Sequence, residues 1–166
     1  VLTAKWIDTT YFTLPDSDVK TMNTAVTATI GYVYKPSLNW QFNGVLSSGF
    51  RSPNIDDIGK VREKRGEVTV PNTDLEPEFA YNFEASVLKY FDSKKSHIVF
   101  TTYYTLLDNY IVRGTYELNG NSTLIYNGEL CNVVANVNMG NAYLIGGTLL
   151  FKGQLSNTWN TRASLT

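Results

Sequence analysis

The stretch that decides the fold runs from residue 49 to residue 84. It contains GFRSPNIDD at residues 49–57, VPNTDLEPE at residues 70–78 and YNFE at residues 81–84. Apolar and polar residues alternate on either side of it, whereas its middle is rich in charge, proline and asparagine. Alternation with a period of two is typical of β-strands, because successive side chains point to opposite faces. The stretch therefore predicts a strand that ends near residue 50, a long connection, and a strand that begins near residue 80.

The same alternation recurs along the chain. Trp40, Phe42 and Leu46 share one face of such a segment, and Gln41 and Asn43 share the other. The predicted strands lie at residues 4–12, 24–34, 38–50, 80–91, 97–112, 141–151 and 155–165. Sustained helical periodicity is missing from the sequence, which therefore predicts an all-β fold of about seven antiparallel strands.

The connections between these strands alternate between short and long. Residues 35–37, 92–96 and 152–154 are expected to be tight turns, and residues 51–79 and 113–140 to be long irregular loops. A compact soluble domain rarely has two such loops, whereas outer-membrane barrels combine short periplasmic turns with long external loops. About 9–11 residues of strand cross a bilayer, and aromatic residues cluster near the predicted strand ends, as in interfacial girdles. These features favour a transmembrane β-barrel segment.

Composition excludes several classes of protein. The 14 basic and 15 acidic residues give a net charge of −1, which provides no field for nucleic acid. No run of about 18 apolar residues is present, which excludes a membrane-spanning helix. A single cysteine, Cys131, excludes a disulfide framework and a cysteine-rich metal module. The sequence indicates no catalytic residues, no metal site and no cofactor.

The stretch quoted first resembles the barrel signature of TonB-dependent outer-membrane receptors. In that family a GFR(A/S)PN segment ends one strand, and a (P)N-x-x-L-x-P-E segment leads into the next, which carries an inward glutamate. The matching residues here are Phe50, Arg51, Pro53, Asn54, Asn72, Leu75, Pro77, Glu78 and Glu84. We expect Arg51, Pro53 and Asn54 to shape the turn, because residues shared by importers of different cargo do not select the cargo.

The resemblance implies a barrel of about 22 strands with a plugged lumen. It implies active import, across a bacterial outer membrane, of nutrients such as iron-siderophore complexes, haem, cobalamin or glycans. The implied partners are the receptor's own plug domain, the remaining barrel strands, an inner-membrane TonB complex, lipid and a small nutrient ligand. Residues 1–166 are then expected to be an internal part of the barrel domain, with the plug domain and the C-terminal strands outside this sequence.

The second long loop carries the candidates for ligand contact. They are aromatic, basic and amide residues: Tyr110, Arg113, Tyr116, Asn119, Asn121 and Tyr126. Such groups suit stacking on, and hydrogen bonding to, a planar or sugar-like ligand. Packing within the loop, or a place in the interfacial aromatic belt, explains the same residues equally well.

The first long loop carries two groups of charged residues. The acidic group comprises Asp56, Asp57, Asp74, Glu76 and Glu78, which we expect to be solvated, since no EF-hand spacing is present. The basic group comprises Lys60, Arg62, Lys64 and Arg65, interrupted by Glu63. It suits an anionic ferric siderophore or lipopolysaccharide phosphates, but Glu63 and Glu67 dilute the charge, which favours a solvated loop.

Two other functions fit the same pattern. One is a complete small outer-membrane barrel that acts as an anchor or adhesin, and the other is a soluble carbohydrate-binding β-sandwich. A sandwich requires Ile30, Trp40, Phe42 and Phe83 to be covered by a second layer. A membrane barrel instead requires these side chains to face lipid and a polar set to face the lumen: Asn39, Gln41, Asn43, Glu84, Thr101 and Arg162.

Overall fold

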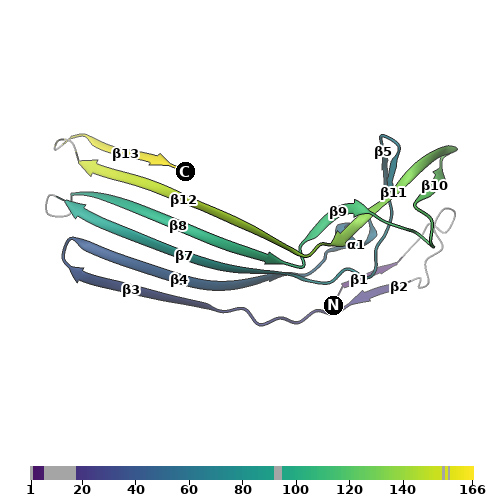
Figure 1. The fold of residues 1–166 in the computed structure, drawn as a ribbon, viewed down its shortest axis with the longest axis horizontal. Helices are drawn as coiled ribbons and strands as arrows, with labels where there is room; N and C mark the ends of the chain where they lie inside the picture. The colour runs from purple at the N-terminus through teal and green to yellow at the C-terminus, as the bar shows by residue number, and fades with distance from the viewer. Residues whose placement is uncertain (1, 6–17, 92–94, 155, 157) are drawn as a thin grey trace. The chain divides into compact units, whose positions relative to one another are not determined.

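The computed structural model describes residues 2–5, 18–91, 95–154, 156 and 158–166 (Figure 1). The chain divides into two compact units. Residues 27–49, 80–107 and 142–166 form the first, called here the sheet unit. Residues 1–26, 50–79 and 108–141 form the second, called here the loop unit.

The sheet unit is built on a six-stranded sheet whose strand order is β13-β12-β8-β7-β4-β3 (Figure 1). Its strands are β3 (Thr29–Ser37), β4 (Trp40–Arg51), β7 (Glu78–Phe91), β8 (Ser96–Asp108), β12 (Asn141–Gln154) and β13 (Asn160–Leu165). Strands β3 and β4 pair antiparallel with Ile30 opposite Leu46, and β12 and β13 pair antiparallel with Lys152 opposite Arg162. Strands β4, β7, β8 and β12 are long enough to cross a bilayer, as expected.

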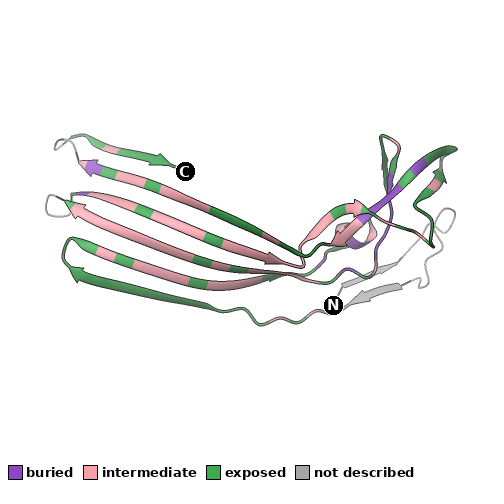
Figure 2. Ribbon diagram, viewed as in Figure 1, coloured by how far each residue is buried: buried purple, intermediate pink, exposed green. Residues whose placement is uncertain are grey.

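The two faces of this sheet differ in chemistry. On one face large apolar side chains are exposed, among them Ile30 at 68%, Phe83 at 48% and Phe42 at 38%. The strands of this sheet are coloured almost throughout as exposed or intermediate in Figure 2. On the other face polar side chains bond to one another across strands: Asn43 Nδ2 donates to Ser86 Oγ at 2.8 Å and Thr105 Oγ1 donates to Asn82 Oδ1 at 2.7 Å. The exposed rings and aliphatic groups are those that a sandwich would bury, so the sandwich alternative loses its support.

The predicted long loops are not irregular, and this expectation is wrong. The loop unit contains a second sheet of order β10-β11-β6-β5, with β9 also paired to β11. Its elements are α1 (Ile55–Gly59), β5 (Arg62–Lys64), β6 (Glu67–Thr69), β9 (Ile111–Thr115), β10 (Thr123–Tyr126) and β11 (Glu129–Asn138). Strands β6 and β11, which belong to different loops, pair in parallel with Val68 opposite Val133. The two connections therefore fold together.

Three two-residue turns occur in these connections, and two of them join neighbouring strands. Arg65-Gly66, Asn119-Gly120 and Asn127-Gly128 all have positive φ at both residues. This is the geometry of a type I′ turn, whose twist matches that of the strands on either side, and Asn-Gly is its preferred sequence. The turns at residues 65–66 and 127–128 join β5 to β6 and β10 to β11.

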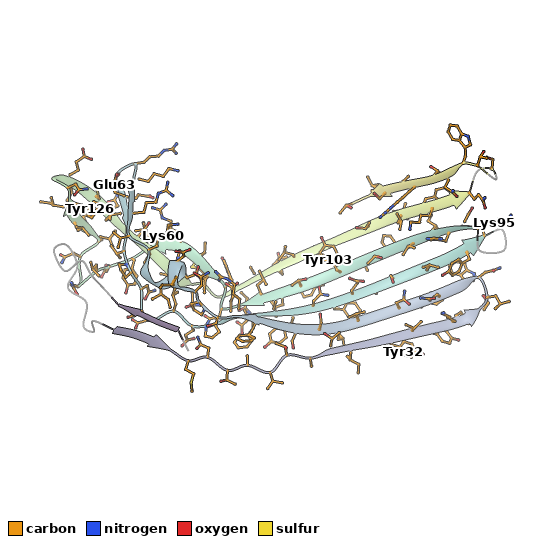
Figure 3. All side chains as sticks on the ribbon, turned by 180° about the vertical axis from the view of Figure 1, so that it is seen from behind. Tyr32, Lys60, Glu63, Lys95, Tyr103 and Tyr126 are labelled. Atoms are coloured by element: carbon orange, nitrogen blue, oxygen red, sulfur yellow. The ribbon has the colours of Figure 1, made fainter. Side chains whose placement is uncertain are left out.

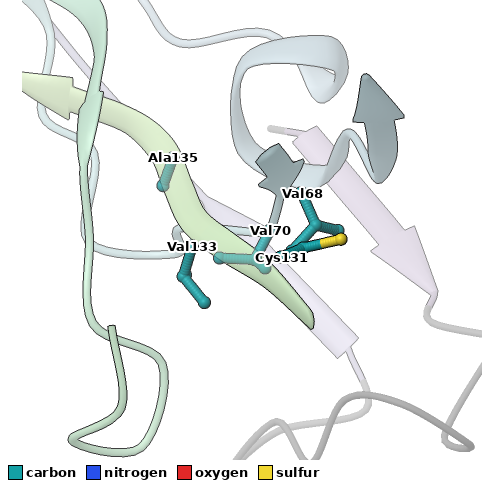
Figure 4. Packing of buried hydrophobic residues seen from close by; sticks show 5 residues of the cluster. All are labelled: Val68, Val70, Cys131, Val133 and Ala135. Atoms are coloured by element: carbon teal, nitrogen blue, oxygen red, sulfur yellow. The ribbon is translucent and has the colours of Figure 1, made fainter. Parts of the chain in front are cut away.

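The loop unit has a small hydrophobic core. Val68, Val70, Cys131, Val133 and Ala135 are each at most 2% exposed and contact one another (Figure 4). A partly buried apolar set packs against them: Val61, Tyr116, Leu118, Leu124 and Tyr126. Burial, and then Glu63 and Glu129, raise the pKa of the Cys131 thiol. Cys131 is thus a neutral packing residue, as its sequence context suggested.

Several strand ends differ from the predicted ones. The expected strand at 24–34 begins at Thr29, and the one at 155–165 begins at Asn160. The expected strand at 97–112 is interrupted at Asn109, whose φ of 58° breaks the extended backbone, and the chain continues as β9 in the other sheet.

The N-terminal strand and the helix also differ from the prediction. The expected strand at 4–12 overlaps only the end of β1 (Leu2–Lys5), which pairs with β2 (Asp18–Thr21), and its residues 6–12 lie outside the described residues. The five-residue helix α1 was not predicted. No helix among the described residues is long and apolar enough to cross a membrane.

Candidate functional site

Arg51 lies at the centre of the signature segment. At the end of β4, its Nη2 donates to both carboxylate oxygens of Asp57, at 2.7 and 2.9 Å. Its Nη1 lies 3.2 Å from Glu78 Oε2, and the same oxygen accepts a hydrogen bond from the Ile111 backbone N–H at 2.8 Å. We call the chain between β4 and β7 the first connection and the chain between β8 and β12 the second connection. Arg51 thus joins the start of the first connection to its end, and Glu78 joins both to the second connection.

Asn54 begins helix α1. Its side chain accepts from Asp57 N–H at 2.9 Å, and Asp57 Oδ2 accepts from Asn54 N–H at 3.0 Å, which is a capping box. Pro53 is buried directly before this cap. The neighbouring Phe50 ring stacks on Phe79, with 6.3 Å between ring centroids. The segment therefore ends a strand and starts a helix within four residues.

Asn72 holds the second signature segment against the other connection. It is 6% exposed, and its Nδ2 donates to the Asn136 carbonyl at 2.8 Å while its Oδ1 accepts from Asp74 N–H at 3.0 Å. Asn136 Nδ2 in turn donates to the Asp57 carbonyl at 3.0 Å. Leu75 is buried a few residues later.

Asn138 and Asn109 complete this set of contacts. Asn138 Nδ2 donates to the carbonyls of Glu76 and Asn109, at 2.9 and 2.8 Å, and its Oδ1 accepts from Glu76 N–H at 2.8 Å. Asn109 Nδ2 donates to Glu76 Oε2 and to the Pro77 carbonyl, both at 3.2 Å. Backbone groups of the two connections are thus held by side-chain amides, and we call Arg51, Asn72, Asn109, Asn136 and Asn138 with these contacts the clamp.

The acidic residues of the first connection depart in part from the expectation of a solvated loop. The side chains of Asp57 and Glu78 are 13% and 24% exposed and both pair with Arg51. A hydrogen bond or ion pair compensates a partly buried carboxylate for lost hydration. Asp56 is exposed, as expected.

The loop unit also carries a groove of about 480 Å³ beside its core. It is lined by a mixture of carboxylate, hydroxyl, amide and apolar groups: Glu67, Thr115, Tyr116, Glu117, Ser122, Asn132, Val133 and Val134. Arg113 Nη2 lies 3.0 Å from Glu67 Oε2, so an ion pair stands at the groove wall. Most of this lining is polar or charged, and Val133 and Val134 are its aliphatic part, so the groove offers mainly hydrogen-bonding groups.

The structure brings only two of the predicted ligand residues to this groove. Tyr116 lines it and Arg113 pairs with Glu67 at its wall. Asn119 occupies a turn with φ of 52°, Tyr126 packs on the core, and the Tyr110 carbonyl accepts from Met139 N–H at 2.8 Å. Burial and then Asp74 raise the pKa of Tyr116, which keeps its phenol protonated.

The basic residues of the first connection lie on and beside a sheet edge. Arg62 and Lys64 are exposed on β5, whose one partner among the described strands is β6, and Lys60 and Arg65 flank β5. Figure 3 shows Lys60 and Glu63 among the side chains of this region. Lysines on an edge strand also protect it from pairing with other chains.

Glu84 lies in β7 between Asn82 and Ser86. Both neighbours bond across strands on the polar face, and the period of two therefore places Glu84 on that face. The inward position that the signature implied for Glu84 stays a prediction, because it depends on this polar face being the lumen face.

Sequence reasoning missed the three asparagines of the second connection, Asn109, Asn136 and Asn138. Asn136 and Asn138 lie two positions apart in β11 and therefore share a face, but this spacing is only weak evidence for a shared role. The groove residues Ser122 and Asn132 were also missed, but Asn127-Gly128 was a usable signal, because it marks the turn that joins β10 to β11.

Solved structures of similar fold include three receptors. The HasR hemophore receptor of Serratia marcescens, in complex with its hemophore HasA and heme, matches with a TM-score of 0.62 and 16% identity, over 76% of this chain and 20% of that chain. The siderophore receptor PirA of Acinetobacter baumannii matches with a TM-score of 0.59 and 18% identity, over 79% of this chain and 21% of that chain. The siderophore receptor PirA of Pseudomonas aeruginosa matches with a TM-score of 0.62 and 16% identity, over 84% of this chain and 28% of that chain. This chain therefore spans between a fifth and under a third of each receptor's length.

No curated protein matches the sequence. A family model described as TonB dependent receptor-like, beta-barrel matches residues 5–166. That range includes the six-stranded sheet, both connections and the whole signature stretch. The chain therefore belongs to the TonB-dependent receptor β-barrel family, and its six-stranded sheet is a segment of an outer-membrane barrel.

Proposed function

We propose that this chain forms part of the wall and the external loops of an active nutrient importer of the iron-siderophore or haem class. Family membership supports import, and the siderophore and heme receptors of similar fold support the class of cargo. The single observation that carries the proposal is the family match over residues 5–166. The resident plug domain, the TonB complex and the other barrel strands are part of the same proposal.

In this proposal the two faces of the sheet lie in different surroundings. Apolar side chains such as Ile30 and Phe83 meet lipid, where exposure has no hydrophobic cost. The hydrogen-bonded polar face, with Asn43, Asn82 and Glu84, lines the lumen. A wall of this kind needs no second layer of protein.

The groove of the loop unit contributes to cargo binding in this proposal. Glu117, Ser122 and Thr115 offer oxygen acceptors, and Tyr116 offers a ring whose phenol stays neutral. Such groups fit the hydroxyl, amide and amine groups of an organic chelator. The remainder of the binding site would come from other loops of the barrel.

Uptake by the full-length receptor tests this function. A strain that lacks the receptor gene, complemented with the wild-type gene, should grow on a single ferric siderophore or on haem as the iron source, and a protonophore should abolish uptake of the labelled compound. Glycan and cobalamin sources test the other cargo classes in parallel. If complementation restores uptake of none of these compounds, the proposed function is wrong.

A groove variant tests the role of the loop unit. The change Glu117→Gln with Ser122→Ala should weaken ligand binding about tenfold, equivalent to about 1.4 kcal/mol. Glu129→Gln is the matched control, because Glu129 is an exposed glutamate of the same sheet outside the groove lining. Equal affinity in all three proteins would remove the groove from the binding site.

A further inference from the structure

Lys89 places a positive charge on the apolar face of the six-stranded sheet. It lies in β7 six positions after Phe83, whose ring is exposed on that face, and the period of two puts both residues on the same side. Its Nζ lies 4.8 Å from the centroid of the Trp40 ring and 5.3 Å from that of the Phe91 ring. Trp40 in turn stacks on Phe42, with 6.2 Å between ring centroids.

No described residue of the sheet unit neutralises this charge. Glu84 is the only side-chain carboxylate among the residues that the structure describes in this unit. It precedes Lys89 by five strand positions, and the odd spacing puts it on the opposite face. A cation that faces hydrocarbon without an anion is unfavourable, and aromatic faces compensate only part of that cost. Lys89 therefore favours an anionic partner.

The lysine lies near the end of the sheet where the short turns are. Trp40 is the first residue of β4 and Phe91 the last of β7, and Figure 1 shows these two strand ends at the same end of the sheet. The Tyr90 N–H donates to the Asn39 carbonyl at 2.8 Å, which holds β7 to the turn before β4. Lys89 is two residues, or about 7 Å, from the end of β7. Its long side chain can therefore extend to the level of lipid headgroups.

A second cation lies beside the same tryptophan. Lys35 and Trp40 line one cavity of about 350 Å³, whose lining is completed by Ser37, Leu38, Gln41 and Tyr90. None of the ion pairs between described residues includes Lys35 or Lys89. Two unpaired ammonium groups, an aromatic ring and hydrogen-bonding groups around a space of this size suit a phosphate that carries a glycerol headgroup.

We propose that Lys89 and Lys35, which both lie beside Trp40, bind the phosphodiester of an anionic phospholipid in the periplasmic leaflet of the outer membrane. The leaflet follows from the position at the short turns, which are periplasmic in outer-membrane barrels. The headgroup has a net negative charge, because the ammonium of a zwitterionic lipid competes with the lysines for its own phosphate. The inference takes the apolar face as the lipid face of the barrel and is independent of the imported cargo.

Native mass spectrometry of the purified full-length receptor tests the site. After release from nanodiscs that contain equal amounts of phosphatidylglycerol and phosphatidylcholine, Lys89→Gln should retain one phosphatidylglycerol molecule fewer than the wild type. Lys89→Arg should retain the wild-type number, since a guanidinium also binds phosphate. Lys152→Gln is the matched control, because Lys152 is three positions after the exposed Leu149 in β12 and the odd spacing puts it on the opposite face.

Two results of this experiment would overturn the proposal. One is equal retention by the wild type and Lys89→Gln, which is expected if Lys89 instead pairs with a protein carboxylate such as that of Asp92, which lies outside the described residues. The other is an equal loss in Lys152→Gln, which would mean that the lipid responds to net charge and not to this site.

Chemical labelling gives a second measurement on the receptor without substitutions. Acetylation of Lys89 by a neutral amine-reactive ester should be severalfold slower in phosphatidylglycerol nanodiscs than in phosphatidylcholine nanodiscs, because an ammonium group bound to phosphate is less reactive. Lys152 should show little change, and equal slowing of both lysines would also overturn the proposal. Uptake of iron compounds reports on import separately, so failure of the lipid site and failure of the proposed function are distinguishable.

Discussion

The sheet unit and the loop unit place the same kinds of residue in opposite surroundings. In the sheet unit, valine, isoleucine and aromatic side chains are exposed, Ile145 and Tyr143 to more than 70%. In the loop unit, Val68, Val70 and Val133 are at most 2% exposed and form a compact core. The difference shows that the surroundings of each unit, and not its strand content, determine where apolar side chains lie. They are stable in contact with lipid, whereas contact with water is unfavourable and drives them into a core.

The largest test of this contrast is a charge on the apolar face of the sheet unit. Leu46→Arg, near the middle of β4, should destabilise the full-length receptor in bilayers by about 2–4 kcal/mol, because lipid cannot solvate the guanidinium. Ser47→Arg is the control, since the adjacent residue points to the lumen face. Denaturant unfolding from lipid vesicles measures both, and equal losses would mean that the two faces have the same solvent.

A smaller change probes the core of the loop unit. Val68→Ala removes buried methyl groups and should lower the local stability of this unit by roughly 2 kcal/mol. Hydrogen exchange of β6 and β11 in the full-length receptor measures the effect. Ile125→Ala, at an exposed position of β10, should change exchange little, and an equal effect of both substitutions would contradict a buried core.

The clamp gives an intermediate test. Arg51→Gln should cost about 1 kcal/mol in local stability, since it breaks the ion pair in which Nη2 reaches both Asp57 oxygens and a second ion pair with Glu78, at a half-exposed site. Arg113→Gln, which breaks one contact between two exposed side chains, should cost less. Faster exchange of the Ile111 amide in Arg51→Gln alone is the expected signature, because that amide bonds to Glu78.

The smallest effect concerns pH. Burial raises the pKa of Tyr116 above its ordinary value of 10.0, so the unfolded loop unit loses this proton before the folded one does. Stability of the loop unit should therefore fall as pH rises above about 10. Tyr116→Phe should make stability depend less on pH in this range. Hydrogen exchange between pH 9 and 11, corrected for intrinsic rates, measures the effect. The same pH dependence in both proteins would mean that the phenol does not contribute.

The sequence alone predicted the sheet unit well. The alternation of Trp40, Phe42 and Leu46 with Gln41 and Asn43 specifies two different faces, and period two is read directly from neighbours in the chain. Strand ends were less accurate, because a break such as the one at Asn109 depends on a backbone conformation that tertiary contacts select.

The loop unit could not be predicted in the same way. Parallel pairing of β6 with β11 joins residues more than 60 positions apart, and three-residue strands such as β5 and β6 carry too short a pattern to recognise. The signature segment could be located, but not its partners: no local rule points from Asn72 to Asn136. Of the ligand candidates, Tyr116 reached the groove, and the rest of the groove depends on this long-range pairing.

The parallel pairing between β6 and β11 also has a consequence for how such receptors can be altered. An external connection exchanged alone for that of a relative would leave its neighbour with unpaired backbone amides and half a core. Changes in the two connections must therefore be compatible with each other, and grafting experiments should exchange residues 51–77 and 109–140 together.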